Sequence, residues 1–338
     1  MGHQADPERP GTGEAGVVTV PPVDSGSMTD EPLRSSFRAS EAIVRKRARN
    51  FWYGLRLTPE PRRSQLYAVY AWMRAVDDLA DEPGPSVDQR RASLGAFRDR
   101  TRAIFAGEAP TVDADEAWWN AFSHVVATRS LDIKPFEDMI EGQILDLDWD
   151  ACRNRAELER FCRLVASTVG DVCVSVWGHD GHEDVPALAD ARGLALQMTN
   201  VLRDLREDHE RGRVYLPADE LAAAGLDMDR LLGWRDPARC EAFLRSQIEA
   251  TRAHYDASAS LEAHLEPGCR ATSWAMCEIY RGLLDRIAAN PRQVVEKRVR
   301  LGSWRKARIA FRARRLARAG GTFPVRSEEH TSELQSRQ

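Results

Sequence analysis

The sequence predicts an all-α fold, a single bundle of helices, and three observations support this prediction. Between about residues 33 and 320 the chain is rich in Ala, Leu, Arg and Glu, and its apolar residues recur at helical spacing. Proline or glycine clusters separate these segments, as at residues 59–61, 83–85 and 266–268. Strand-like alternation is short and rare, and no repeat of fixed period indicates a solenoid.

The composition of the 338-residue chain is that of an ordinary globular protein, with 43% hydrophobic and 30% charged residues. No apolar run approaches the roughly 20 residues that a helix needs to span a bilayer. The net charge of −4 gives no reason to expect a nucleic-acid partner. Six cysteines are scattered without a CxxC pair, which predicts reduced, mostly buried thiols in a reducing, cytoplasmic compartment.

The two ends of the chain differ from the rest. The first 32 residues hold five prolines, five glycines and no aromatic residue, so we expect residues 1–33 to form a disordered leader without a signal peptide. From Ser327 onward the sequence is polar and lacks periodicity, and residues 323–338 are interpreted as a disordered, artefactual tail. These expectations leave residues 34–322 as the folded domain.

The segment at residues 64–82 is a predicted helix with acidic residues beside its apolar surface. At 100° per residue, one narrow stripe carries Tyr70, Arg74, Asp77 and Asp81. Most of the remaining circumference is apolar, which predicts a buried helix. Burying unpaired carboxylates costs several kcal/mol, so Asp77 and Asp81 need a cation that Arg74 supplies only in part.

The segment at residues 187–212 repeats this arrangement. One stripe of the predicted helix carries Gly193, Gln197, Asn200, Asp204, Asp208 and Arg211. Leu194, Met198, Val201 and Leu205 form an apolar stripe beside it. Again two aspartates four residues apart adjoin a surface that should pack inward.

Two such DxxxD pairs facing one another across a cavity suit Mg²⁺, a hard ion that binds one or two carboxylates together with substrate phosphates. The ions would stabilise a diphosphate leaving group without a protein nucleophile. Arginines beside the aspartates would add charge-assisted hydrogen bonds to phosphate oxygens; these are Arg74, Arg203, Arg211 and Arg213. A single pair on a solvated helix face is the alternative, and the recurrence of the pattern favours a metal–diphosphate site.

Four segments carry a resemblance to a known family. YAVYAWMRAVDDLAD at 67–81 and QMTNVLRDLREDHERGRVYLP at 197–217 resemble the two aspartate-rich motifs of the squalene/phytoene synthase family. FEDMIEGQILDLDW at 136–149 and LVASTVGDVCVSVWG at 164–178 resemble two intervening segments of that family. The resemblance covers roughly residues 37–310.

The resemblance implies an isoprenoid synthase fold around a deep central cavity and the head-to-head (1′–1) joining of two prenyl diphosphates in isoprenoid and carotenoid biosynthesis. It implies Mg²⁺ as the cofactor, with Mn²⁺ as a substitute. The implied metal ligands are Asp77, Asp81, Asp204, Asp208 and Asn200. Implied catalytic tyrosines are Tyr70 and Tyr280, and the implied substrate-binding residues also include Arg74, Gln197, Arg203 and Arg213.

One element departs from the family pattern. Members often carry Ser-Lys-Ser-Phe before the first motif, whereas this chain has Ala48, Arg49, Asn50 and Phe51. Arg49, Asn50 and Phe51 are expected to bind substrate at the matching positions. The guanidinium of Arg49 is a planar fork rather than the point charge of a lysine, so this part of the site is not equivalent.

The expected reaction converts two molecules of geranylgeranyl diphosphate into phytoene through prephytoene diphosphate. The alternative is a presqualene diphosphate or squalene-type synthase that uses farnesyl diphosphate. No recognisable nicotinamide-binding site is present, so NADPH is not expected. Two further alternatives are a non-catalytic assembly factor, which should have lost its aspartates, and a terpene cyclase or chain-elongating prenyltransferase, which should lack the second motif.

Three polar segments remain. Residues 291–318 are strongly basic and form either a solvated helix face or a surface for anionic lipid; in the second case the protein associates peripherally with the inner face of a membrane. The sequence leaves the oligomeric state open between a monomer and a weak dimer. The histidines of GHDGHEDV at 178–185 are attributed to a polar loop rather than a metal site. Asp146 and Asp148, two residues apart, are expected to form a cap or a salt bridge rather than a third acidic pair.

Overall fold

The computed structural model describes residues 31–48, 51–110, 116–320 and 323–324. This part of the chain contains helices and two isolated β-bridges but no strand, which confirms the all-α prediction. Its first helix begins at Glu31, inside the last three residues assigned to the leader. Residues 1–30 and 325–338 lie outside the described residues, so disorder at both ends stays a prediction. None of the described helices combines the length and apolar character needed to cross a bilayer.

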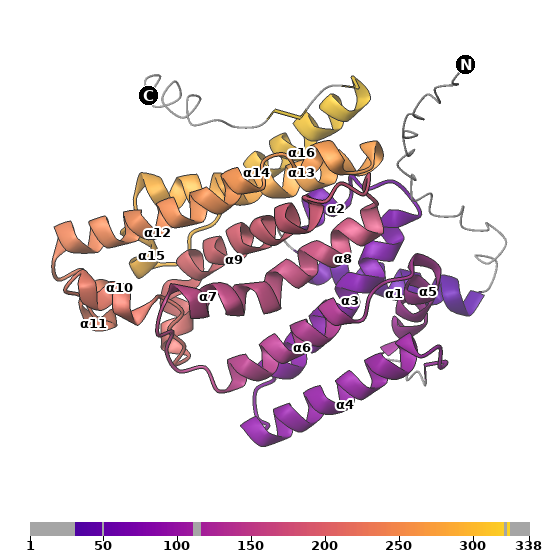
Figure 1. Ribbon diagram of the computed structural model, residues 1–338, viewed down its shortest axis with the longest axis horizontal. Coiled ribbons are helices and arrows are strands. Elements are labelled where there is room, and N and C mark those ends of the chain that lie inside the picture. The colour runs from indigo at the N-terminus through magenta and orange to yellow at the C-terminus, as the bar shows by residue number, and fades with distance from the viewer. Residues whose placement is uncertain (1–30, 49–50, 111–115, 321–322, 325–338) are drawn as a thin grey trace, which may run out of the picture.

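The N-terminal half of the chain forms one side of the bundle (Figure 1). Its core is rich in aromatic rings, with Trp72, Trp119, Phe122 and Phe136 all buried and in contact with one another. The helices of this side are α1 (Glu31–Arg47), α2 (Phe51–Leu55), α3 (Arg62–Asp81), α4 (Val87–Phe105), α5 (Trp119–Arg129), α6 (Lys134–Leu147) and α8 (Thr168–Trp177).

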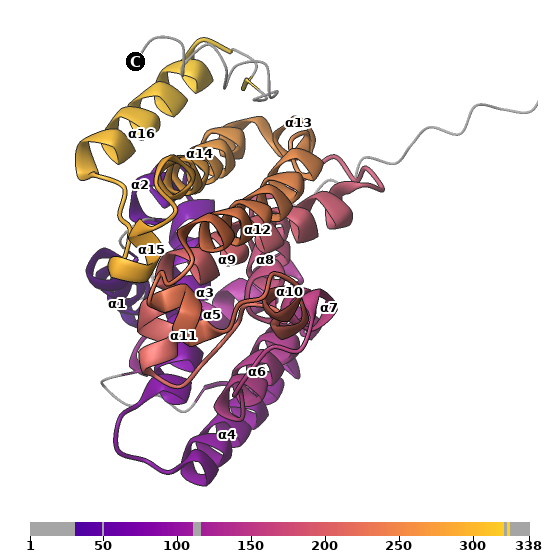
Figure 2. The same ribbon diagram turned by 90° about the vertical axis from the view of Figure 1, so that its left-hand side faces the viewer.

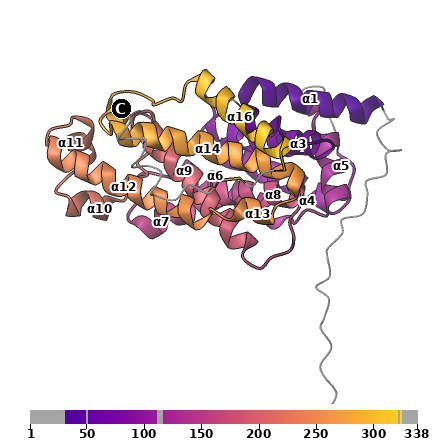
Figure 3. The same cartoon turned by 90° about the horizontal axis from the view of Figure 1, so that it is seen from above.

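The C-terminal half forms the other side, with a second hydrophobic core around α9, α12 and α14. Figure 2 and Figure 3 show α14 beside α9 and α12, with α16 on the outside of the bundle. The helices of this half are α9 (Val185–Glu210), α10 (Ala218–Ala223), α11 (Met228–Leu232), α12 (Pro237–Ala257), α13 (Leu261–His264), α14 (Pro267–Ala289), α15 (Gln293–Glu296) and α16 (Ser303–Arg318). The second core also receives α7 (Arg155–Cys162), which precedes α8 in the chain.

A π-helical segment, Arg163–Ser167, joins α7 to α8 and packs between the two halves. It approaches two glycines of neighbouring helices at very short range. A Cβ at Gly193 of α9 would lie 2.4 Å from the Cα of Ser167, and one at Gly142 of α6 would lie 2.7 Å from Cγ1 of Val165. The missing side chains at these two positions therefore allow the segment to sit deep in the bundle.

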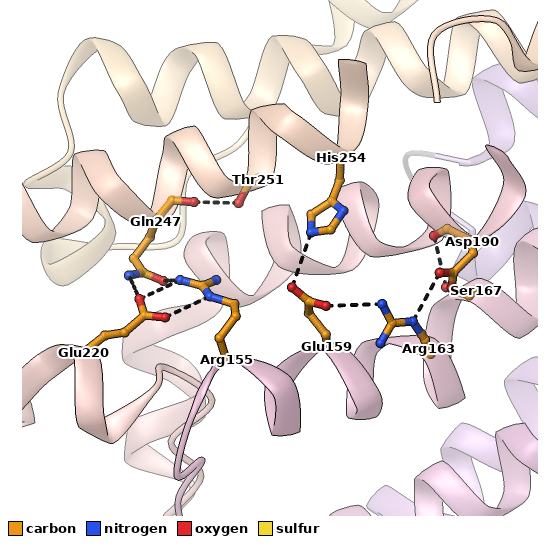
Figure 4. A network of polar contacts seen from close by, with 9 residues as sticks. All are labelled: Arg155, Glu159, Arg163, Ser167, Asp190, Glu220, Gln247, Thr251 and His254. Carbon is orange, nitrogen blue, oxygen red and sulfur yellow. Dashed lines mark hydrogen bonds and ion pairs between the residues drawn. The ribbon is translucent and has the colours of Figure 1, made fainter. Parts of the chain in front are cut away.

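Ion pairs hold this region to α9 and α10, and a histidine contact joins it to α12 (Figure 4). Arg163 donates to Asp190 of α9 at 3.1 Å and contacts Glu159, and His254 of α12 lies 3.8 Å from Glu159. Nearby, Arg155 makes a two-bond contact with Glu220 at 2.7 and 2.9 Å. These contacts fix the rotation of α7 and hence the residues that the π-helical segment turns inward.

The two helices that carry the DxxxD pairs form nearly as the sequence predicts. The first was expected at residues 64–82 and is Arg62–Asp81; the second was expected at 187–212 and is Val185–Glu210. Their apolar stripes are buried, as expected for helices that pack inward. All six cysteines are free and buried, in agreement with the sequence analysis.

Candidate active site

A cavity of about 960 Å³ lies between the two hydrophobic cores. Its lining comes from α2, α3, α6, α8, α9, α14, the π-helical segment and residues 298–306. Part of the wall is apolar and receives side chains from both halves of the molecule: Leu55, Leu66, Val69, Met73, Val165, Val169, Val174, Trp177, Met276 and Leu283. The remainder is lined by charged residues, which makes the cavity amphipathic.

The four predicted aspartates all line this cavity. Asp77 and Asp81 come from α3, whereas Asp204 and Asp208 come from α9. The two stripes derived from helical periodicity therefore border the same cavity. A fifth carboxylate, Asp146 of α6, lines it as well.

On the α3 wall, Asp77 accepts a hydrogen bond of 2.8 Å from Nε2 of Gln143 on α6. Arg74 lies one turn before it, with Nη1 3.8 Å from Oδ2 of Asp77. The other Nη of Arg74 binds Asp78, which also contacts Arg47 at 2.6 Å. Arg74 is thus held at the edge of the cavity beside Asp77.

On the α9 wall, Asp204 contacts two guanidinium groups. Arg203 Nε donates to its Oδ1 at 2.7 Å, and Arg298 Nε lies 2.9 Å from the same oxygen. Arg298 also contacts Glu207 at 2.7 Å. Because Arg298 belongs to the chain between α15 and α16, these contacts join that segment to the acidic wall.

Arg213 links the α3 wall to Asp146. Its Nη1 lies 3.2 Å from Asp81 and its Nη2 lies 3.0 Å from Asp146, which also accepts a hydrogen bond of 2.5 Å from the hydroxyl of Tyr215. Val214, which lies between Arg213 and Tyr215 in the chain, forms a β-bridge with Ala151. The loop after α9 is therefore held against the end of α6.

Burial changes the proton affinity of the carboxylates. Loss of hydration raises the pKa of Asp77 to about 7, opposed by Arg74 and reinforced by Asp81. Protein surrounds the side chain of Asp77, and its exposed fraction of 36% is the part that faces the cavity. Burial also raises the pKa of Asp208 to about 7, with Asp204 adding to the rise. Desolvation is thus the main cause of both shifts, and the charge of a neighbouring carboxylate adds to each of them.

The donor set fits a divalent ion held jointly by protein and substrate. Among the described residues no three Asp, Glu, His or Cys side chains are grouped so that they hold an ion alone. Mg²⁺ usually takes one or two carboxylates and completes its shell with phosphate and water oxygens, so separate walls suit it when a diphosphate lies between them. The Oδ1 of Asn200 is buried and, within the described structure, has no hydrogen-bond partner. An oxygen in that state fits a cation ligand.

Aromatic side chains adjoin the charged residues. Phe51 and Tyr280 have ring centroids 5.5 Å apart, and both line the cavity together with Tyr70. Burial raises the pKa of Tyr70 to about 12, so its phenol stays neutral at physiological pH. The faces of these rings can stabilise a positive charge on a substrate carbon.

The structure brings the other predicted substrate-binding residues to the same cavity: Arg74, Gln197, Asn200, Arg203 and Arg213 line it. Arg49 and Asn50 lie outside the described residues, and their roles stay predictions. The predicted salt bridge of Asp146 is confirmed by Arg213, whereas its position in the cavity was not foreseen. In the GHDGHEDV loop, Asp180 contacts His264 at 3.0 Å.

Several lining residues were missed by sequence reasoning. Gln143 and Asp146 come from α6, a segment noted for its resemblance and for Asp146, which was assigned to a cap or a salt bridge and not to the site. Arg298, Arg300 and Lys306 belong to the basic C-terminal stretch, which was assigned to solvent or lipid. No periodicity marks the irregular residues 297–302, so only the fold places their charges at the cavity.

Comparisons with known proteins agree with this geometry. Residues 44–305 match the family model described as squalene/phytoene synthase. The phytoene synthase of Mycobacterium tuberculosis is 35% identical over 285 residues, which span 83% of this chain and 91% of that protein. The 15-cis-phytoene synthase of Synechococcus elongatus is 34% identical over 286 residues, spanning 81% and 91%.

Solved structures show the same fold. A dehydrosqualene synthase in complex with a ligand superposes with a TM-score of 0.75 at 24% identity, covering 86% of this chain and all of that one (100%). A squalene synthase from Alicyclobacillus acidocaldarius gives a TM-score of 0.70 at 27% identity, covering 81% and 99%. The bundle is therefore the isoprenoid synthase fold of this group of proteins.

Proposed function

This chain belongs to the squalene/phytoene synthase family, and from this membership we propose that it joins two molecules of geranylgeranyl diphosphate head to head. The product is phytoene, formed through the cyclopropyl intermediate prephytoene diphosphate, and two diphosphates are released. The enzyme is a prenyltransferase of isoprenoid and carotenoid biosynthesis.

One observation carries the proposal: two aspartate pairs from α3 and α9 line the same cavity, and another part of the wall of that cavity is apolar. A prenyl diphosphate has the same division, with a charged head and a long hydrocarbon tail. The heads are expected between Asp77, Asp81, Asp204 and Asp208, and the tails along the apolar wall. A non-catalytic relative would not need to keep all four carboxylates.

We propose that Asp77, Asp81, Asn200, Asp204 and Asp208 hold Mg²⁺, for which Mn²⁺ can substitute. The bound ions supply Lewis-acid stabilisation to the departing diphosphate. Arg74, Arg203 and Arg213, each already oriented by an acidic partner, add charge-assisted hydrogen bonds to phosphate oxygens. Gln197, which accepts from Asn200 at 3.1 Å, orients that amide. Arg49, Asn50 and Phe51 are proposed to complete the diphosphate end.

The apolar wall protects the reacting carbons. Loss of diphosphate leaves an allylic cation that water would quench, so a cavity lined by apolar groups preserves it for attack by the second chain. We propose that Tyr70, Tyr280 and Phe51, which line the cavity, stabilise that charge. The whole conversion releases two diphosphates and two protons. It adds no hydride, so the proposed reaction needs no NADPH, whereas a reductive squalene synthase would.

We also propose that the protein is cytoplasmic and acts at the inner face of a membrane as a monomer or weak dimer. Its proposed substrates and product are lipids, which partition into bilayers. Residues 34–322 are proposed as one catalytic domain, with the leader and the tail outside it.

Product identification tests the function directly. The purified chain is incubated with Mg²⁺ and either geranylgeranyl or farnesyl diphosphate, with and without NADPH, and the products are separated and identified. We expect phytoene from the first substrate whether or not NADPH is present. Presqualene diphosphate, dehydrosqualene or squalene as the main product would support the alternative, and the absence of any joined product would overturn the proposal.

A further inference from the structure

Helix α16 lies on the outside of the bundle and packs with one side only (Figure 2). Its inner side rests against α14 and α2, where Ala313 is buried and Arg312 stacks on Trp274. The opposite side faces away from the rest of the described structure. Two large apolar residues on that outward side are exposed: Trp304 at 91% and Phe311 at 68%.

These two aromatic residues share one stripe. They are seven residues apart, which is close to two helical turns, so both point in nearly the same direction and lie about 10 Å apart along the axis. By the same periodicity Arg308, Arg315 and Arg318 project on this side. The outward face of α16, defined as Trp304, Arg308, Phe311, Arg315 and Arg318, thus alternates aromatic and cationic side chains.

The charged residues of α16 are all basic. The helix contains seven basic residues and no acidic residue, in a chain whose net charge is −4. Within the described part of the chain, Arg308, Arg315 and Arg318 form no ion pair with an acidic residue, although most other helices carry such pairs. Their charges are available to an anionic partner.

The position of α16 connects this face to the cavity. Arg298 and Leu301, just before α16, and Ser303 and Lys306, in its first turn, all line the cavity. Trp304 lies within that turn. A surface in contact with the beginning of α16 would therefore lie beside the part of the cavity that holds Arg298 and the acidic wall.

We propose that the outward face of α16 docks on an anionic lipid bilayer, with Trp304 and Phe311 entering the headgroup region and the arginines binding lipid phosphates. The proposal deepens the proposed function, on which it rests for the lipid nature of the substrate, by naming the surface that meets the membrane. An amphipathic helix with aromatic and basic residues on one face is suited to the interface of an anionic bilayer. In this orientation the cavity lies close to the membrane, so a prenyl diphosphate can pass from the bilayer into it.

The test measures binding to vesicles without substrate, so that it is independent of turnover. The full chain is mixed with vesicles of pure phosphatidylcholine or of equal parts phosphatidylcholine and phosphatidylglycerol, and bound protein is separated by flotation. We expect binding to the anionic vesicles only.

Each basic residue at such a surface strengthens binding roughly fivefold, so Arg308→Gln/Arg315→Gln/Arg318→Gln should weaken it about a hundredfold. Trp304→Ser/Phe311→Ser should weaken it at least tenfold, which a purely electrostatic attraction would not show.

A matched control removes three exposed arginines elsewhere. Arg230→Gln/Arg239→Gln/Arg245→Gln on α11 and α12 changes the net charge equally and should alter vesicle binding less than threefold. Circular dichroism and turnover of detergent-dispersed substrate verify that each variant is folded. Equal weakening by the control, or no binding of the parent chain at low salt, would overturn the proposal. A change in sedimentation velocity caused by the aromatic variant alone would instead assign the face to a second copy of the chain.

Discussion

Gly193 of α9 lies against Ser167 of the π-helical segment so closely that a Cβ at position 193 would be 2.4 Å from the Cα of Ser167 and 2.7 Å from its backbone nitrogen. The neighbouring atoms are backbone, which cannot rotate away as a flexible side chain can. Val165 and Ala166 of the same segment line the cavity. A close helix contact thus shapes the wall of the proposed active site.

The substitution Gly193→Ala should therefore destabilise the protein and distort the cavity. Overpacking of this kind costs about 1–3 kcal/mol, and here it exceeds the gain of up to about 1 kcal/mol from replacing glycine within a helix. Chemical denaturation measures the free energy of unfolding. Gly95→Ala in α4 is the control, because a Cβ there meets no atom within 4 Å and should stabilise the protein slightly. Equal effects of the two substitutions would contradict the packing argument.

The sequence predicted the two aspartate helices to within two residues at each end, since local signals define them. Prolines precede α3 and follow it, and the apolar stripe of each helix has a clear period. The side of each helix that faces the cavity follows from the same period. The assignment of Asp77 and Asp204 to a common site needed only the further assumption that these sides meet.

The missed residues depend on contacts between distant segments. Asp146 reaches the cavity because α6 packs against α3 and the π-helical segment, where Gly142 permits a close approach. Arg298 reaches Asp204 from an irregular connection across more than ninety positions, as their hydrogen bond shows. Neither the approach of α6 nor the path of that connection is encoded in a local period, so sequence reasoning had no signal for them.

Removal of one acidic group of the α9 wall should abolish catalysis while preserving the fold. Asp204→Asn keeps the size of the side chain but removes the charge that binds Arg203 and the proposed metal. We expect kcat/KM to fall by more than about a hundredfold. Substituting a residue that only supports a metal ligand costs at most about that much, and a ligand itself should cost more. Steady-state kinetics with Mg²⁺ measures this, and far-ultraviolet circular dichroism should be unchanged. Glu210→Gln, at the exposed end of the same helix, should retain near-normal activity.

The buried pair Arg192–Glu262 should contribute to stability far more than a surface pair. Arg192 Nη1 lies 2.7 Å from Glu262, and both side chains are about nine-tenths buried. Glu262→Gln leaves a buried guanidinium without its counter-charge, which costs about 3–5 kcal/mol of unfolding free energy. Glu241→Gln breaks the exposed pair with Arg245 and should change that free energy by less than about 1 kcal/mol. Similar losses in both variants would show that Arg192 is stabilised instead by Ser258, whose hydroxyl and carbonyl oxygens accept hydrogen bonds of 2.9 and 2.8 Å from it.

The stability of the metal-free protein should fall as the pH rises through neutrality. The pKa of Asp77 is raised to about 7 in the folded state, above the value of about 3.9 of an unfolded chain. Folding therefore favours the protonated carboxyl; its contribution to stability is complete below about pH 4 and is lost as the pH rises through 7. Asp208, with a pKa also near 7, acts in the same direction.

Asp77→Asn removes this titration and isolates its effect. In the presence of EDTA the variant should melt at a higher temperature than the parent chain at pH 8, and the difference should shrink toward pH 5, where the parent carboxyl is largely protonated. Mg²⁺ with diphosphate should raise the melting temperature of the parent at pH 8 and that of the variant much less, because only the parent has the Asp77 charge to bind the ion. A difference in melting temperature that does not depend on pH would mean that Asp77 is ionised throughout this range and that its burial does not hold the proton.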